Sequence, residues 1–125
     1  MVKEFSFLIG NCPGALVEIA EAMGEAHANI IGIGGLTVLE EGVVGLVADE
    51  ASKARKVLRD QGIDFEEREV LVLEIPSHPG ELATVLRRLN ADQINVLSCY
   101  AGVEKNQLML TVDKVDRAKE IFHLA

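Results

Sequence analysis

Two similar stretches decide the fold, Asn11-Cys12-Pro13-Gly14 and Ser77-His78-Pro79-Gly80, and each is followed by apolar residues at helical spacing. The two Pro-Gly pairs lie 66 residues apart, since 79 minus 13 is 66. The same offset places Asn29 on Asn95. Similar segments at a fixed offset are typical of an internal repeat. The sequence therefore predicts two copies of one structural unit.

Each copy is predicted to begin with a strand that leads into a helix. The strands have apolar residues at every second position, which indicates one face packed on a core. In the helices the apolar residues recur every three or four positions, and each proline ends its strand before the helix begins. The strand residues are Phe5, Phe7 and Ile9, then Leu71, Leu73 and Ile75; the helix residues are Leu16, Ile19, Ala20 and Met23, then Leu82, Val85, Leu86 and Leu89.

Two strands and a second helix are predicted to complete each copy. The strand pairs read as hairpins, residues 30–39 with 43–48 and residues 96–103 with 108–112. The first has a tight turn at Glu40-Glu41-Gly42, and the second turns around Lys105-Asn106. Each hairpin is followed by an aspartate and a capping residue, Asp49 with Ser52 and Asp113 with Asp116. Short helices come next, with Ala54, Val57 and Leu58 or Ala118, Ile121 and Phe122 on their apolar faces.

The segment between the copies is predicted to be extended, as one long strand that finishes the first unit and begins the second. Gln61-Gly62 closes a helix, and residues 63–75 contain no strong breaker before Pro76. Each copy is then β-α-β-β-α-β, and the fold class is α+β: two ferredoxin-like βαββαβ repeats, with antiparallel sheets backed by helices, in residues 1–69 and 70–125. The counterpart of Phe65 falls beyond Ala125, so we expect the second repeat to lack its last strand. Strand 71–75 would then be an unprotected edge.

Composition limits the classes of function. The chain has 125 residues, 49% of them apolar, with a formal charge of -8, no Trp and one Tyr. This is enough apolar material for a core, which excludes a disordered segment, whereas the acidic balance and few aromatic residues argue against nucleic-acid binding. The apolar runs are too short to span a bilayer, and the N-terminal run has no signal-peptide cleavage site. We predict a soluble, cytoplasmic protein that binds neither nucleic acid nor membrane.

The cysteines, histidines and clustered glycines do not have the spacing typical of metal, redox or phosphate-binding sites. Cys12 and Cys99 lack Cys-x-x-Cys spacing and are expected to be reduced thiols, and the three histidines lack metal-ligand spacing. Gly32-Ile33-Gly34-Gly35 is followed by no helix, which argues against a phosphate-binding loop. No nucleophile and base are grouped in the sequence. We therefore predict no cofactor, no metal and no enzymatic activity.

The two Pro-Gly loops are the strongest candidates for a binding site. A helix that begins directly after a strand aims free backbone N–H groups at the loop, and these groups suit a carboxylate. The groups concerned lie at residues 14–16 and 80–82. Asn29 and Asn95 offer amide donors and acceptors at the start of the next strand, and for either one turn formation and ligand contact remain equally open.

These residues resemble the ACT domains, which are small-molecule-binding regulatory modules attached to, or partnered with, enzymes of amino-acid metabolism. The resemblance covers the whole chain as two tandem copies. It implies that units associate side by side through their second strands and that an amino acid binds at this interface against the first strand-helix loop. The implicated ligand-binding residues are Asn11, Cys12, Pro13, Gly14, Ala15, Leu16, Asn29 and Ile30 in the first copy, and Ser77, His78, Gly80, Glu81, Leu82 and Asn95 in the second.

The resemblance also implies individual roles. Asn11 matches the asparagine with which serine-binding members hold their ligand, and Asn29 and Asn95 match a second contacting asparagine. The second copy has Ser77 at the first of these positions. A histidine that some members place two residues earlier is Ile9 here, and Ile75 in the second copy.

The predicted function is a stand-alone regulatory module, a homo-oligomer that binds an amino acid between ACT units and signals through assembly or through a partner such as an enzyme of amino-acid metabolism. The alternative is a structural protein-protein interaction module that has no small-molecule ligand and pairs through the exposed strand 71–75.

Overall fold

A computed structural model describes the chain except residues 1, 11, 77, 102–105 and 125. The chain divides into two compact units, Met1–Glu69 (unit 1) and Val70–Ala125 (unit 2). Among the described residues, no helix has the length and apolar composition needed to cross a bilayer.

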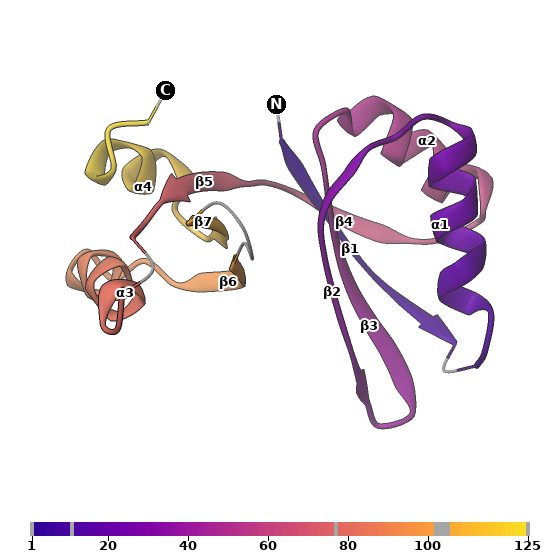
Figure 1. The fold of residues 1–125 in the computed structure, drawn as a ribbon, viewed down its shortest axis with the longest axis horizontal. Coiled ribbons are helices and arrows are strands. Elements are labelled where there is room, and N and C mark those ends of the chain that lie inside the picture. Colours follow the sequence, from indigo (N-terminus) through magenta and orange to yellow (C-terminus); the bar gives the residue numbers. More distant parts are fainter. Residues whose placement is uncertain (1, 11, 77, 102–105, 125) are drawn as a thin grey trace. The chain divides into compact units, whose positions relative to one another are not determined.

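Unit 1 is a four-stranded antiparallel sheet with two helices on one face (Figure 1). Its strand order, β2-β3-β1-β4, is that of the predicted ferredoxin-like repeat, which confirms the prediction. The elements are β1 (Lys3–Gly10), α1 (Ala15–Glu25), β2 (Ile30–Val38), β3 (Glu41–Ala48), α2 (Ala51–Asp60) and β4 (Phe65–Glu69).

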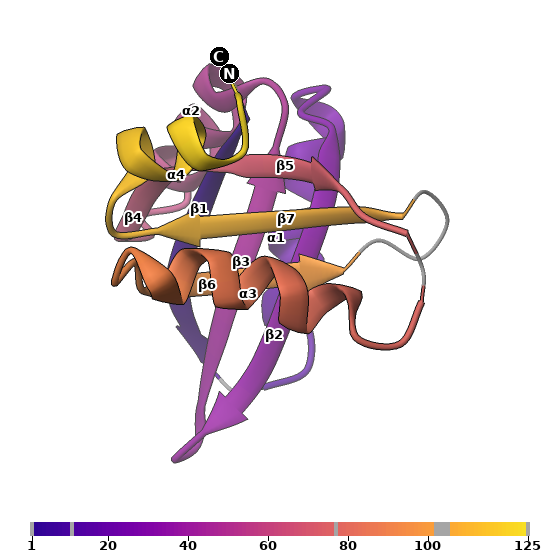
Figure 2. The same ribbon diagram turned by 90° about the vertical axis from the view of Figure 1, so that its left-hand side faces the viewer.

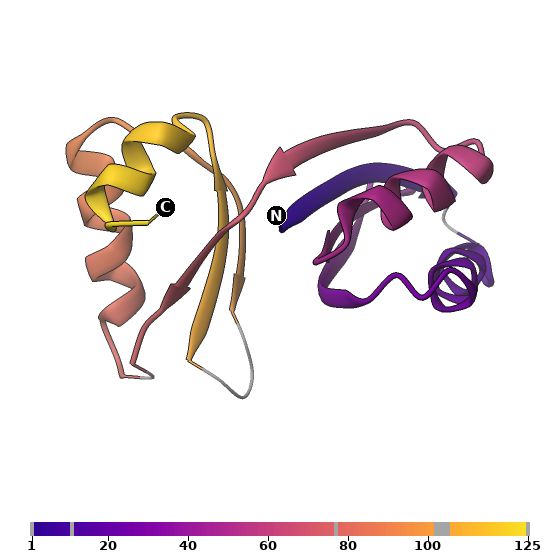
Figure 3. The same cartoon turned by 90° about the horizontal axis from the view of Figure 1, so that it is seen from above.

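Unit 2 repeats this plan with three strands among its described residues, in the order β5-β7-β6 (Figure 2). Figure 3 shows both of its helices on one face of the sheet. The elements are β5 (Leu71–Glu74), α3 (Glu81–Ala91), β6 (Val96–Ala101), β7 (Gln107–Val112) and α4 (Val115–Ile121). The position that β4 has beside β1 is not filled beside β5 in the described chain, so β5 is the predicted edge strand.

The repeat extends to unusual backbone features at the same offset of 66. Gly14 and Gly80 precede α1 and α3 with φ of 94° and 91°. His27 and Gln93, after the same helices, both have φ of 56°. One register shift lies at the start of β2 and another at the start of β6. Left-handed backbone is rare outside glycine, so its recurrence shows that the two units share local geometry as well as topology.

Each unit has its own core between one sheet face and its helices. In unit 1, Phe5 and Met23 are fully buried, and the rings of Phe5 and Phe65 meet edge to face with centroids 5.4 Å apart. In unit 2, Leu89 and Leu110 are among the most deeply buried core residues. The predicted core residues that are buried are Phe5, Phe7, Ile19, Met23, Ala54, Val57, Leu58, Leu71, Leu73, Val85, Leu89 and Ala118; Ile9, Ile75, Leu86, Ile121 and Phe122 are partly buried against the same cores.

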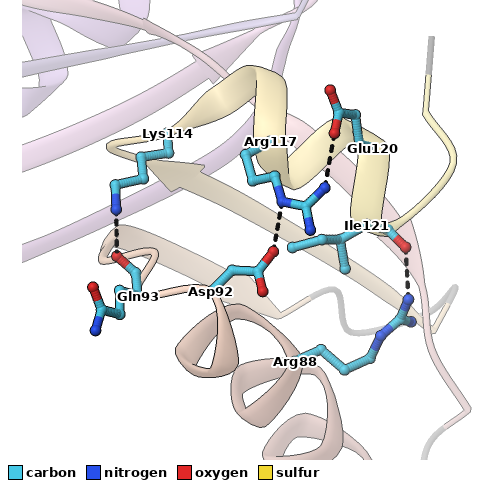
Figure 4. Close-up of polar contacts among 7 residues, drawn as sticks. All are labelled: Arg88, Asp92, Gln93, Lys114, Arg117, Glu120 and Ile121. Atoms are coloured by element: carbon cyan, nitrogen blue, oxygen red, sulfur yellow. Dashed lines mark hydrogen bonds and ion pairs between the residues drawn. The ribbon is translucent and has the colours of Figure 1, made fainter.

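Polar contacts join α3 and its following turn to α4 (Figure 4). Arg117 Nε donates to Asp92 Oδ2 at 2.6 Å, and Lys114 Nζ donates to the carbonyl oxygen of Gln93 at 3.0 Å. These contacts hold the two helices of unit 2 together at one end.

Part of the predicted helix faces is wrong. Leu16 and Leu82 are each 43% exposed, and Ala20 is also exposed. The face of α1 that meets the sheet runs through Ile19 and Met23. Leu16 lies one turn before that contact, so its spacing fits a helix although no described element covers its side chain.

The first hairpin turns earlier than predicted. The turn is Leu39-Glu40, with φ of 47° and 68°, whereas Glu41 and Gly42 already belong to β3. Gly42 is required by close packing instead of by the turn, because a Cβ atom there would lie 2.9 Å from Ile9 Cγ1.

Two other local predictions also need correction. Ser52 and Asp116 lie inside α2 and α4. The N-cap residues of these helices are Glu50 and Lys114, and neither side chain forms a capping hydrogen bond. The extended stretch 63–75 divides at Val70 into β4 and β5, which belong to different sheets. A run without breakers therefore did not correspond to one strand.

Candidate functional site

The two Pro-Gly loops are backbone copies of each other. In each, one loop N–H donates to the carbonyl oxygen two residues before it, a second bond joins the loop to the first helical residue, and a third closes the first turn of the helix. The bonds are Cys12 N to Gly10 O at 3.0 Å, Ala15 N to Cys12 O at 3.4 Å and Glu18 N to Gly14 O at 3.1 Å, matched by His78 N to Pro76 O at 3.0 Å, Glu81 N to His78 O at 3.3 Å and Thr84 N to Gly80 O at 3.0 Å.

The loops leave the helix starts accessible. Gly14 and Gly80 are the N-cap residues of α1 and α3, and neither helix has a side-chain capping bond. The first-turn N–H groups of a helix have no acceptor within the helix, and its positive dipole end attracts anions. This arrangement can bind a carboxylate.

Most of the predicted loop residues are open to solvent. The exposed ones are Cys12, Pro13, Gly14, Leu16, His78, Gly80 and Leu82, and the half-buried ones are Ala15 and Glu81. Asn11 and Ser77 lie outside the described residues. The two loops differ chemically, because Glu81 places a carboxylate in the first turn of α3 where α1 has Ala15.

The predicted asparagines do not lie beside these loops within their own units. In unit 1 the register pairs Gly10 with Glu41 at one end of the sheet and Ile30 with Ala48 at the other. The loop after β1 is therefore separated from Asn29, at the start of β2, by the length of a strand, roughly 20 Å at about 3.3 Å per residue. Figure 1 shows the starts of α1 and β2 at opposite ends of the sheet.

Both asparagines bond to the aspartate that follows the hairpin. Asn29 Nδ2 donates to Asp49 Oδ2 at 3.3 Å. In unit 2 the backbone N–H of Asn95 donates to Asp113 Oδ1 at 2.9 Å, and the N–H of Asp113 donates to the Asn95 carbonyl at 3.1 Å. The side chain of Ile30, also a predicted site residue, packs against the core of unit 1. Asn29 thus has a structural contact, and its exposed amide also remains open to solvent.

An exposed apolar edge runs between the asparagine and the loop, on the second strand through which the resemblance implies that units associate; its exposed strand residues were not among the predicted site residues. β2 is the edge strand of its sheet, with Ile31 40% and Ile33 49% exposed, and Leu16 and Val17 are exposed in the first turn of α1. In unit 2, β6 is the edge strand, with Leu97 44% exposed. Exposed apolar side chains on an edge strand are typical of an interaction surface. The available signal was the offset of 66 between Ile31 and Leu97.

Cys99 is not activated as a nucleophile in this fold. Cys99, on β6, is a free thiol whose pKa is raised by burial. A raised pKa keeps the protonated thiol at neutral pH and makes it a poor nucleophile.

The fold is shared with several solved structures. Protein BT0572 from Bacteroides thetaiotaomicron has a TM-score of 0.85 and 24% identity, covering 98% of this chain and 88% of that one. The regulatory subunit of aspartate kinase from Thermus thermophilus, in its ligand-free form, has a TM-score of 0.76 at 14% identity, and the same subunit from Thermus flavus 0.73 at 12%; each alignment covers 98% of this chain and 88% of that one. Comparison with curated protein sequences gives no match.

The family assignment comes from the sequence itself. The family model described as an ACT domain pair matches residues 1–125. The two βαββ-containing units, with equivalent loops and equivalent edge strands, are the two members of this pair. The chain therefore belongs to the ACT family as a tandem pair of ACT domains.

Proposed function

We propose that this chain is a non-catalytic regulatory module that binds an amino acid at the interface between two ACT units and passes on the signal through assembly or through a partner enzyme of amino-acid metabolism. The observation that carries the proposal is the placement of the loop and of Asn29 at opposite ends of the exposed edge strand β2.

This placement suits a site built from two units. When two β2 strands pair antiparallel along their edges, the start of one strand lies beside the end of the other. Asn29 of one copy then approaches the loop before α1 in the second copy, and the exposed Ile33 and Leu16 become buried. Assembly and ligand binding would therefore be linked, because the site is complete only in the pair.

The chemistry of the site suits an α-amino acid. The ligand carboxylate takes the N–H groups at the start of α1, and the Asn29 amide supplies a donor and an acceptor for the remaining polar groups. Asn11 is the second amide in this proposal. Glu81 makes the start of α3 less favourable for an anion, so the unit 1 loop is the stronger carboxylate site.

The proposed setting is the cytoplasm, with no metal, cofactor, nucleic acid or membrane taking part. The fold is shared with the regulatory subunit of aspartate kinase, which supports a partner among the enzymes of amino-acid metabolism. A ligand at a hundred times its Kd stabilises the bound form by about 2.7 kcal/mol, enough to shift an oligomer equilibrium.

A ligand panel tests the proposal. Thermal unfolding is followed with each of the twenty amino acids and with common intermediates of their pathways. We expect a concentration-dependent rise in Tm for one compound or a few related ones. A folded protein whose Tm does not respond to any member of the panel would contradict the proposal.

Two variants then locate the site. Asn11→Ala combined with Asn29→Ala should weaken the affinity at least tenfold in calorimetry while the chain stays folded. Asn90→Ala, an exposed asparagine at the end of α3, is the matched control and should leave affinity unchanged. Equal affinity for the double variant and the control would reject the assigned residues.

A further inference from the structure

A pocket of about 540 Å³ opens in unit 2 beside the unpaired edge of β5. Its walls include Leu73 and Ile75 from β5, Val85 from α3, and Phe122 and Leu124 after α4. Glu74, Arg88, Gln107 and His123 also line it, so the pocket has an apolar part and a polar part. It lies next to a strand that has a neighbour, β7, on one side only among the described strands.

The equivalent edge of unit 1 is occupied. There β4 pairs antiparallel with β1, which places Phe65 opposite Phe7 and in edge-to-face contact with Phe5. The offset of 66 maps Phe5 and Phe7 onto Leu71 and Leu73. The unit 2 pocket therefore lies where a side chain like that of Phe65 would enter.

The backbone of β5 is arranged to accept another strand. The N–H of Ile75 donates to the carbonyl of Asn106 at 2.7 Å, next to the first residue of β7. Successive N–H groups of a strand point to opposite sides, so those of Leu73 and Leu71 also face β7. The N–H groups of Val72 and Glu74 consequently face the open edge.

The positively charged side chain of Arg88 forms part of the wall of the pocket. Arg88 Nη2 donates to the carbonyl oxygen of Ile121 at 2.6 Å (Figure 4). The guanidinium carbon of Arg88 lies 4.6 Å from the ring centroid of Phe122. Both contacts leave the positive charge in place, and a carboxylate on an incoming strand would complement it. Unit 1 shows a helix arginine paired with a carboxylate of the added strand, because Arg55 donates two hydrogen bonds to Glu67 of β4, at 2.8 and 2.7 Å. Arg55 lies on α2 and Arg88 on α3, so the two arginines are not at equivalent positions.

We propose that this edge of β5 binds an extended segment of a partner protein, antiparallel to β5, which inserts a large apolar side chain into the pocket and places a carboxylate near Arg88. Backbone hydrogen bonds to Val72 and Glu74 supply the pairing, and the pocket supplies selectivity for the side chain. This site lies on the opposite edge of the sheet from β6, so it does not depend on the amino-acid site.

A peptide that copies residues 62–69 of this chain, Gly-Ile-Asp-Phe-Glu-Glu-Arg-Glu, is the probe, since it carries the chemistry of β4. It is labelled and titrated with the full 125-residue chain by fluorescence anisotropy. We expect saturable binding, weakened at least tenfold when the peptide Phe is replaced by Ser. N-methylation of the alternate peptide amides that would hydrogen-bond to β5 should cause the same loss. N-methylation of the other set of alternate amides, which point away from β5, should cause little loss.

Protein variants place the binding on this edge. Glu74→Pro removes one outward N–H while keeping the bonds to β7, since proline is tolerated where a strand N–H faces solvent. It should lower peptide affinity at least tenfold, whereas Glu74→Gln keeps the N–H and should retain binding. Arg88→Ala should weaken binding of the acidic peptide more than that of a peptide with Gln at its Glu positions.

Three results would overturn the proposal. One is the absence of saturable binding to the folded wild-type chain. Another is equal affinity for the two peptides whose alternate sets of amides are N-methylated. The third is a dimer of the chain, detected by light scattering, that Glu74→Pro dissociates and the peptide does not, since a second copy would then occupy the edge.

Discussion

The side-chain amide of Asn29 donates a hydrogen bond to the Asp49 carboxylate, whereas at the equivalent place in unit 2 it is the backbone N–H of Asn95 that donates to Asp113. The two aspartates thus occupy equivalent places but accept from different groups, a side-chain amide in unit 1 and a backbone N–H in unit 2. Each holds the start of the second strand against the end of the third, at the end of the sheet that lies away from the Pro-Gly loop.

This difference predicts unequal costs for two matched substitutions. Asp113→Ala leaves a backbone N–H without its charged acceptor and should lower the free energy of unfolding by about 1 to 2 kcal/mol. Asp49→Ala loses only a long, exposed side-chain bond and should cost less than about 0.5 kcal/mol. Urea denaturation measures both, and a larger loss for Asp49→Ala would contradict this assignment of contacts.

The exposed helix residues predict a separation of stability from assembly. Ile19→Ala creates a cavity in the core of unit 1 and should cost about 2 to 4 kcal/mol, while Leu16→Ala, one turn earlier, should cost less than about 0.5 kcal/mol. If β2 edges pair as proposed, Leu16→Ala and Ile33→Lys should still reduce the molecular mass seen by light scattering. An unchanged assembly in both variants would remove this surface from the interface.

The hairpin turn predicts a stabilising substitution. Leu39 and Glu40 both have positive φ, and a two-residue turn with this backbone favours Asn followed by Gly. Leu39→Asn together with Glu40→Gly should raise the free energy of unfolding by about 1 kcal/mol. Leu39→Ala is the control, because it removes the exposed side chain and keeps the strained backbone; a gain equal to that of the double variant would show that strain is not the cause.

The ion pair between Arg55 and Glu67 predicts a dependence of stability on pH. The hydrogen bonds from Arg55 lower the pKa of Glu67, and partial burial opposes this effect less strongly. A carboxyl group with a lowered folded-state pKa stabilises the fold above its unfolded pKa, near 4.5, and this contribution disappears as pH falls through the folded value.

Glu67→Gln should therefore destabilise the chain at pH 7 and lose less stability than the wild type as pH falls below about 4.5. Thermal unfolding across this range is the measurement. Glu25→Gln, at the exposed end of α1, is the control and should follow the wild-type profile. Parallel profiles for wild type and Glu67→Gln would show that this pair does not carry the effect.

The elements and their repetition could be read from the sequence because they depend on local patterns. Apolar residues at every second position placed β1 and β5, and Pro13-Gly14 and Pro79-Gly80 placed the helix starts, where glycine adopts a left-handed backbone. The repeat offset then predicted which strand of the second unit would be an edge. These features are determined within a few residues of chain.

The tertiary structure alone decided what those residues face. Leu16 has the spacing of a core residue and is exposed, because burial depends on whether another element covers that turn. Gly42 is a residue type common in turns, but it lies in β3. Glycine is needed there because Ile9 on the neighbouring strand leaves no room for a Cβ atom. Asn29 and its loop belong to one predicted site and lie a strand apart, because antiparallel pairing sends them to opposite ends of the sheet. Such relations arise between segments distant in sequence, and local patterns do not encode them.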